Sequence, residues 1–148
     1  MNTVEISTSD IDEPAIDWMV LVAAGYVDAY GVTPQEFLSR WVGGKDKYLH
    51  PSTDWNSAGL VIDKENIALT PKLAGEWVAF TPKGTKVIPF RGSSLETFNW
   101  SNRKTAFTPL KAAMRSYLTH KFGDTVQVPA ILAPSKGWKY GPPPEIGW

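Results

Sequence analysis

The stretch TPLKAAMRSYLTHKFG, residues 108–123, decides the fold. Thr108 suits the capping position of a helix, Pro109 suits its first turn, and Gly123 is a typical terminator. The apolar residues between them recur at three- and four-residue spacing, which places them on one side of a helix. They are Leu110, Ala113, Met114, Tyr117 and Leu118. We therefore expect a helix over residues 108–122 whose apolar side lies in the core.

Two further helices are predicted upstream. Residues 14–24 contain a single polar residue, Asp17, and Gly25 follows as a stop. A helix that is apolar nearly all round is buried on several sides, so it either lies at the centre of the fold or meets another subunit. The second helix begins at Thr33-Pro34-Gln35-Glu36, a capping-box pattern, and ends at Gly43-Gly44.

The middle of the chain has the pattern of short strands. Apolar runs bounded by Gly, Pro, Asn and Asp occupy residues 60–62, 67–69, 76–80, 85–88 and 126–128. The strand at 76–80 is apolar on both faces and is expected in the middle of a sheet. Residues 49–59 are expected to form a polar loop, and residues 91–103 a loop or hairpin. The predicted class is α+β, with a small mixed or antiparallel sheet packed with two or three helices.

The 148 residues fit one domain. We expect a flexible lead-in over residues 1–11, a domain over residues 12–132 and a tail over residues 133–148 that is rich in Pro, Gly and Trp. Such a tail either binds a groove on another protein as a polyproline segment or drapes over its own domain or a sister subunit.

Composition excludes several classes of function. Lys plus Arg and Asp plus Glu number 15 each, so neutralising nucleic-acid phosphates is not expected to be the main task. The chain has no cysteine, which excludes disulfides, thiolate metal sites and cysteine nucleophiles. His50 and His120 are the only histidines, and no metal or cofactor is predicted. No signal peptide is visible, and no apolar run approaches the ~20 residues of a membrane span, so we expect a location in the cytoplasm.

Several segments together resemble the NinX-like family of phage accessory proteins. They are the helix ending in Ala23-Ala24-Gly25, the run from Pro51 through Trp55 to Ile67, the Trp77-Val78-Ala79 strand, and residues 108–129. The likeness covers roughly residues 12–132. Residues 83–104 look longer than the family pattern, and the tail looks additional. The resemblance implies a phage or prophage origin and a protein of the host bacterial cytoplasm, but it implies no reaction.

One loop is the candidate binding site. Ser52-Thr53-Asp54-Trp55 gathers two hydroxyls, a carboxylate and an aromatic ring, which suits the rim of a small-molecule pocket. The alternative is a structural turn whose polar groups bond local amides and whose tryptophan fills the core. Arg115 lies beside the apolar side of its helix, where it either clamps an anionic group or covers apolar surface and pairs with an acid. His50, just before the loop, is a further contact candidate.

Seven tryptophans stand out, and they either pack in the core or stack on a planar ligand. No spacing indicates a catalytic triad or a phosphate-cradling glycine loop. Our leading hypothesis is a non-catalytic phage protein that binds a nucleotide-type signal of bacterial immunity, through Ser52, Thr53, Asp54, Trp55 and Arg115. The alternatives are an inhibitor or adaptor of a host or phage replication or defence enzyme, and an enzyme acting on nucleotides. We also expect a homo-oligomer, because of the apolar helix at residues 14–24.

Overall fold

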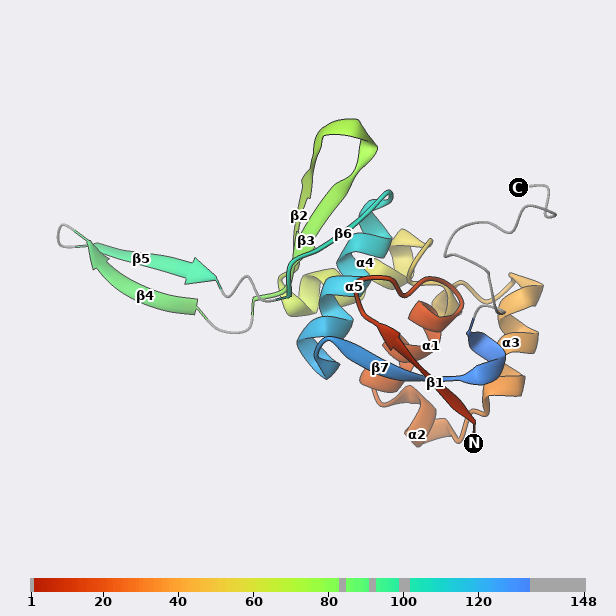
Figure 1. Cartoon of the computed structure of the whole chain (residues 1–148). Helices are drawn as coiled ribbons and strands as arrows, with labels where there is room; N and C mark the ends of the chain where they lie inside the picture. The colour runs from red at the N-terminus through yellow and green to blue at the C-terminus, as the bar shows by residue number, and fades with distance from the viewer. Residues whose placement is uncertain (1, 83–84, 91–92, 99–101, 134–148) are drawn as a thin grey trace.

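The structure is a computed structural model that describes residues 2–82, 85–90, 93–98 and 102–133. At its centre lies helix α5 (Pro109–Phe122), as the sequence predicts (Figure 1). The Thr108 hydroxyl accepts a hydrogen bond from the Lys111 amide at 3.2 Å, and Gly123 ends the helix. All five apolar side chains predicted for its inner side are buried, Met114 and Leu118 completely. The local capping signals and the apolar period therefore agree with the tertiary structure.

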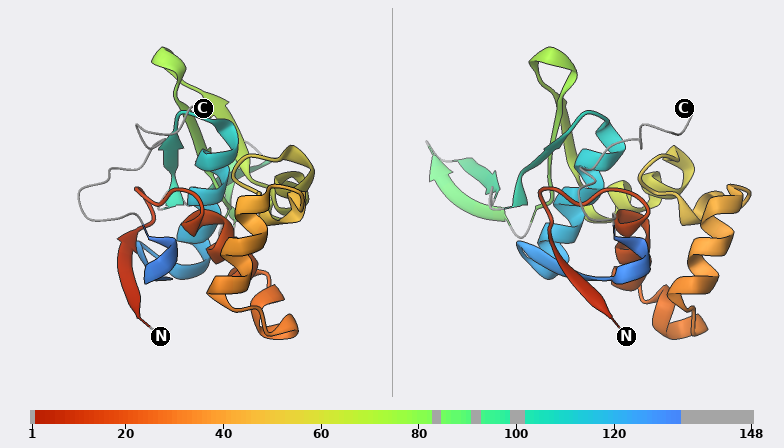
Figure 2. Two further views of the ribbon diagram at one scale, coloured as in Figure 1. Left: turned by 90° about the vertical axis from the view of Figure 1, so that its right-hand side faces the viewer. Right: turned by 45° about the vertical axis from the view of Figure 1, so that its right-hand side comes forward.

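The strands of the described residues form three small antiparallel sheets, two of which contact this helix. They are β2 (Ala68–Pro71), β3 (Trp77–Phe80) and β6 (Lys104–Ala106); β1 (Thr3–Ser7) and β7 (Thr125–Pro129); and β4 (Thr85–Phe90) and β5 (Ser93–Phe98). β3 is the middle strand of its sheet, as predicted, and this sheet packs on α5. The β1–β7 pair lies on a different side of α5, and the β4–β5 hairpin projects from the body (Figures 1 and 2). The fold is α+β with antiparallel sheets, as the sequence predicts.

The N-terminal half is helical. It contains α1 (Ala15–Ala23), α2 (Tyr26–Tyr30), α3 (Pro34–Gly43) and α4 (Trp55–Glu65), with the short turn η1 (Lys47–Leu49) between the last two. α1 packs against α5, and its seven residues from Ala15 to Leu21 are all buried within the one chain. The apolar character of α1 is thereby explained by its central place in the fold and does not call for a second subunit.

Helix α4 corrects the sequence analysis. Leu60-Val61-Ile62 was expected as a strand and residues 49–59 as a loop, but one helix runs through both. It begins at Asp54, whose Oδ1 accepts from the Asn56 amide at 3.3 Å. A three-residue apolar run cannot distinguish strand from helix by period, and Gly59 lowers helix propensity by about 1 kcal/mol relative to alanine. Tertiary contacts decide such a segment, here in favour of the helix that begins at the Asp54 N-cap.

Residues 2–11 do not form the flexible lead-in that the sequence analysis expected over residues 1–11. β1 pairs with β7 from Thr3, opposite Pro129, to Ser7, opposite Thr125. Beyond the strand, the Thr8 amide and hydroxyl bond carbonyl groups at the end of α5, and Ile11 is completely buried. This segment belongs to the domain, although its polar composition concealed that. The predicted tail at residues 133–148 lies outside the described residues except for Ala133.

Candidate functional site

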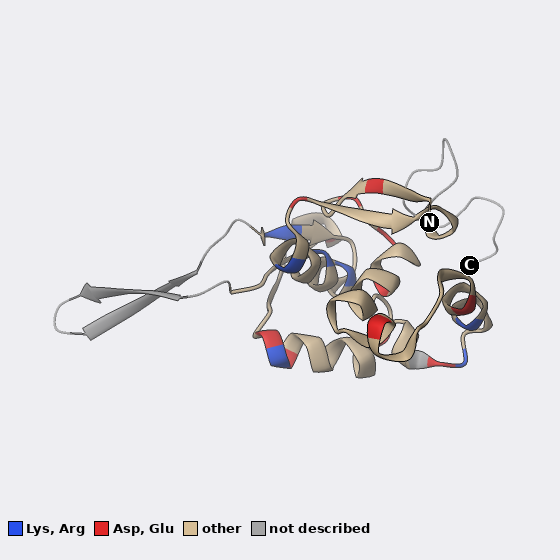
Figure 3. Cartoon of the chain, turned by 90° about the horizontal axis from the view of Figure 1, so that it is seen from below, with Lys and Arg blue, Asp and Glu red and all other residues tan. Residues whose placement is uncertain are grey.

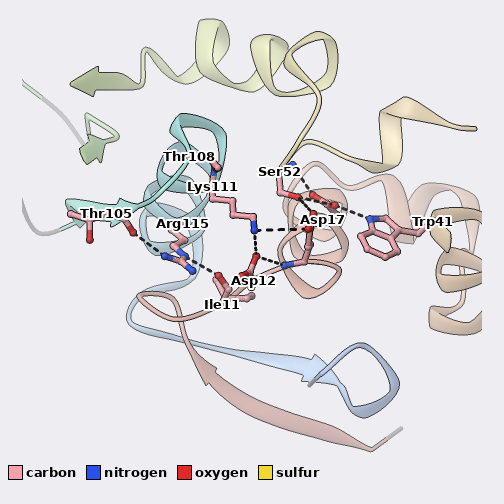
Figure 4. Close-up of polar contacts among 10 residues, drawn as sticks. Ile11, Asp12, Asp17, Trp41, Ser52, Thr105, Thr108, Lys111 and Arg115 are labelled. Atoms are coloured by element: carbon pink, nitrogen blue, oxygen red, sulfur yellow. Dashed lines mark hydrogen bonds and ion pairs between the residues drawn. The ribbon is translucent and has the colours of Figure 1, made fainter. Parts of the chain in front are cut away.

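A buried carboxylate joins three elements. Asp17 is the lone polar residue of α1, and its side chain is completely buried. Its Oδ1 accepts from the Ser52 amide at 2.8 Å, and its Oδ2 accepts from the Ser52 hydroxyl at 3.0 Å and from Trp41 Nε1 at 2.8 Å (Figure 4). Because Trp41 lies on α3 and Ser52 precedes α4, Asp17 ties both to α1.

Charged groups continue this network toward α5. Lys111 Nζ lies 2.8 Å from Asp12 Oδ1 and 3.9 Å from Glu13 Oε1, and the Ser52 hydroxyl lies 3.2 Å from Glu13 Oε2. On the next turn of α5, Arg115 donates from Nε to the Ile11 carbonyl at 2.8 Å and from Nη1 to the Thr105 carbonyl at 2.9 Å (Figure 4). The segment before α1 is therefore held from α5 by two basic side chains.

The electrostatics of Asp17 follow from its position. Burial, the largest cause, raises the pKa of Asp17 from 3.8 to about 7, because the charged form loses water. The hydrogen bonds from Trp41 and Ser52 oppose this rise in the pKa, whereas the nearby charge of Glu13 adds to it. Asp17 therefore changes charge near neutral pH.

A pocket lies next to this network. Its walls include Gly44, His50, Thr53 and Asp54, and its volume is about 280 Å³. Gly44 ends α3 with a left-handed φ of 68°, a conformation that favours glycine. The His50 ring stacks on the Trp41 indole, with centroids 5.1 Å apart and planes 26° apart. Since Trp41 also bonds Asp17, the pocket wall is linked to the buried carboxylate.

Two polar atoms of these wall residues are left unsatisfied. His50 Nε2 and Asp54 Oδ2 are buried and have no hydrogen-bond partner within the part of the chain that the structure describes. Buried polar atoms are nearly always hydrogen-bonded, so such exceptions require an explanation. One explanation is a bound ligand or an ordered water that occupies the adjacent pocket and donates a hydrogen bond to Asp54.

The predicted binding loop divides between two environments. Thr53 and Asp54 line the pocket, whereas Ser52 points into the interior toward Asp17. Trp55 is 56% exposed at the start of α4, so it does not fill the core. The amides of Thr53 and Asp54 both donate to the His50 carbonyl, at 3.0 and 2.8 Å. The loop is therefore a structural turn and at the same time a pocket wall.

Arg115 lies apart from that pocket. Its guanidinium reaches the Ile11 and Thr105 carbonyls, and it is not among the described residues that line the cavity. Both Arg115 and Ser52 nevertheless contact the segment from Ile11 to Asp17, Arg115 at the Ile11 carbonyl and Ser52 at the Asp17 carboxylate (Figure 4). The structure thus brings helix and loop to one region, but it gives Arg115 a role in holding the chain segment before α1.

Sequence reasoning missed Asp17 and Trp41 as site residues. The available signal was the single aspartate in an otherwise apolar helix, because a buried carboxylate requires dedicated donors. Acidic and basic residues are otherwise distributed over several elements of the described part of the molecule (Figure 3). Within that part, no group of three or more histidines or carboxylates has the geometry to hold a metal ion. No described helix is both long and apolar enough to span a membrane.

Comparison with known proteins identifies the family of the chain. No curated protein matches the chain. The family described as "Bacteriophage P22, NinX" matches residues 7–121, which is more than half of the chain. The matched span runs from the end of β1 to the last turn of α5 and includes both the Asp17 network and the pocket. The chain belongs to the phage P22 NinX family.

Proposed function

We propose that this phage protein holds a small nucleotide-type ligand in the pocket between the end of α3 and the start of α4. In the infected cell, retaining such a ligand would withdraw a signal from host defence. The observation that carries the proposal is the unsatisfied pair His50 Nε2 and Asp54 Oδ2 beside a polar cavity. A buried polar group without a partner costs about 1–3 kcal/mol, which a ligand supplying that partner would offset.

The wall chemistry favours a ligand with N–H donors. An ionised Asp54 accepts hydrogen bonds only, so its partner must donate, as the amino and imino groups of a nucleobase do. The volume of about 280 Å³ is at the lower limit of pockets for small molecules, which suits a single base better than a dinucleotide. Trp55, which follows Asp54 in the chain and is exposed, offers a stacking surface, and Lys45, which follows Gly44 and is exposed, offers a charge for a phosphate.

Binding is testable with the intrinsic fluorescence of the tryptophans. We expect a mononucleotide to change the emission with a 1:1 stoichiometry, confirmed by calorimetry. Asp54→Asn exchanges a carboxylate oxygen for a donor while keeping an equally good helix N-cap, so it should leave folding intact and weaken binding about 10- to 100-fold. Asp63→Asn, an exposed aspartate near the end of the same helix, is the matched control.

A panel of nucleotides that produces no binding at millimolar concentration overturns the proposal. Chromatography of the same mixtures after long incubation tests retention against turnover. Recovery of the unchanged nucleotide supports a binding protein, and formation of a product would instead identify an enzyme.

A second candidate function is an inhibitor or adaptor that contacts another protein. It is favoured by two strongly exposed apolar side chains, Leu73 at 93% and Phe107 at 76%. Leu73 lies in the connection between β2 and β3, and Figure 1 shows this connection at the outer end of the hairpin. An infection assay distinguishes the two candidate functions. If the protein holds a nucleotide, Asp54→Asn abolishes its effect on the infection. If it contacts another protein, Leu73→Ser does so.

A further inference from the structure

We infer that Asp17 is the positioning residue of this pocket, holding one wall through Trp41 and His50 and the other through Ser52. The inference rests on the proposed function as far as ligand binding is concerned. The coupling itself is a property of the ligand-free protein, and it can be measured there.

The first wall is held by an indole. Trp41 Nε1 donates to Asp17 Oδ2 at 2.8 Å, which prevents the ring from turning without breaking that bond. The same indole ring also stacks on the His50 imidazole, and the two ring centroids lie 5.1 Å apart. The plane of the His50 imidazole in the pocket is therefore set by the bond that Asp17 makes to Trp41.

The second wall is held by Ser52. Its amide and its hydroxyl both donate to Asp17, at 2.8 and 3.0 Å, and the residue is almost completely buried. Thr53 and Asp54 follow directly in the chain and line the pocket. A shift of Ser52 relative to Asp17 would move both of these wall residues, because consecutive Cα atoms are only about 3.8 Å apart.

One hydroxyl is shared between two acids. Ser52 Oγ lies 3.0 Å from Asp17 Oδ2 and 3.2 Å from Glu13 Oε2, and its single proton can serve only one of them at a time. An ionised Asp17 accepts from Ser52 twice and from Trp41 once. A protonated Asp17 must donate from one oxygen, which turns the Ser52 hydroxyl toward Glu13 and weakens the bond from Trp41. The two protonation states thus hold the walls differently.

The change takes place in an accessible pH range. Burial is the chief cause that raises the pKa of Asp17 to about 7. The ionisable groups around it are Glu13 on the Ser52 side, Lys111 and Asp12 beyond Glu13, and His50 behind the Trp41 ring. Since His50 is itself ionisable, the effect of Asp17 has to be separated by comparing variants at each pH.

The ligand-free test is NMR of the ¹⁵N-labelled protein. The Trp41 indole N–H signal is identified by its loss in Trp41→Phe, and the His50 ring signals by their loss in His50→Gln. We expect the indole signal to titrate near pH 7 in the wild type and to lose that titration in Asp17→Asn, with the His50 signals displaced. Asp63→Asn, which changes an exposed aspartate of α4 outside this network, should retain the wild-type titration. His50 signals identical in the wild type and Asp17→Asn overturn the inference.

The ligand test uses the nucleotide found to bind. If the ionised form of Asp17 is the competent one, affinity falls by up to about tenfold per pH unit below pH 7, and Asp17→Asn abolishes this dependence. If Asp17→Asn does not fold, Trp41→Phe removes the indole donor and keeps an aromatic ring against His50. The dissociation constant of Trp41→Phe for the nucleotide should then rise severalfold. A dissociation constant and a pH profile of binding that both equal those of the wild type overturn the inference. If no nucleotide binds, the proposed function fails, and the NMR comparison still decides the coupling.

Discussion

At the scale of single residues, Asp17 shows how one buried carboxylate organises its surroundings. Its two oxygens receive three donors from residues 24 and 35 positions away. Such partners cannot be read from a local pattern, which is why the sequence indicated an unusual polar residue and not its role. Thr53 and Asp54, by contrast, could be predicted as candidates, because hydroxyl and carboxylate groups in an exposed turn suit the rim of a pocket.

The raised pKa of Asp17 predicts a pH dependence of stability with a definite sign. The folded value of about 7 exceeds the ordinary 3.8, so the folded protein binds the proton more tightly. The tighter binding of this proton adds to the free energy of unfolding. The added stability is fully present below about pH 3.8 and is lost as the pH rises through 7, at up to about 1.4 kcal/mol per pH unit. The measurement is the difference in the free energy of unfolding between wild type and Asp17→Asn, obtained by urea unfolding at pH 4.5, 6.0 and 7.5. The variant should gain stability relative to the wild type as the pH rises, and a constant difference would contradict the assignment.

Leu118 is predicted to be a major contributor to stability. It is completely buried on α5, so Leu118→Ala leaves a cavity and should cost about 2–5 kcal/mol. The matched control is Leu60→Ala on α4, where the side chain is 65% exposed and the change should stay within about 0.5 kcal/mol. Chemical denaturation measures both, and a small effect at Leu118 would show that the core is placed wrongly.

At the scale of elements, α3 and α5 were predictable from their local signals, whereas α4 was not. α3 and α5 each begin with a threonine cap followed by proline and end at glycine, and both ends agree with the prediction. α4 carries its cap on Asp54 and a glycine in its interior, and its apolar residues are too few to show a period. Tertiary contacts decide such a segment, here through the buried Ser57 and Ala58 that face the rest of the fold.

The N-cap of α4 can be tested apart from the pocket. Asp54→Ala removes the side-chain acceptor of the Asn56 amide and should lower the free energy of unfolding by about 0.5–2 kcal/mol. Asp54→Asn restores the cap and should recover most of that loss, although it is expected to bind nucleotide poorly. Thermal unfolding of the two variants beside the wild type measures the cap. Equal stability of all three would mean that the cap contributes nothing to this helix.

At the scale of the whole molecule, the two ends of the domain meet. β1 and β7 pair along five residues, which closes the fold on the side of α5 away from the three-stranded sheet (Figures 1 and 2). The sequence concealed this, because an edge strand with one apolar side is short and polar enough to resemble a loop. Because α1 is buried within the one chain, its apolar character no longer supports the expected homo-oligomer. The homo-oligomer stays a prediction, which light scattering tests.

The closing strand provides the last prediction, in which neighbouring positions of β1 should behave oppositely. Ile6 faces inward opposite Val126, and both are buried, whereas Val4 is 42% exposed on the same strand. Ile6→Ala removes buried apolar volume and should lower the free energy of unfolding by about 2–5 kcal/mol. Val4→Ala should lower it much less, because the Val4 side chain is already partly exposed to water. Urea unfolding of the two single variants measures the difference. If residues 1–11 were only a lead-in, both substitutions would leave the stability unchanged. Unequal losses of stability instead require that β1 is part of the cooperative folding unit. A truncation before Thr8 would then expose β7 and destabilise the domain that carries the pocket.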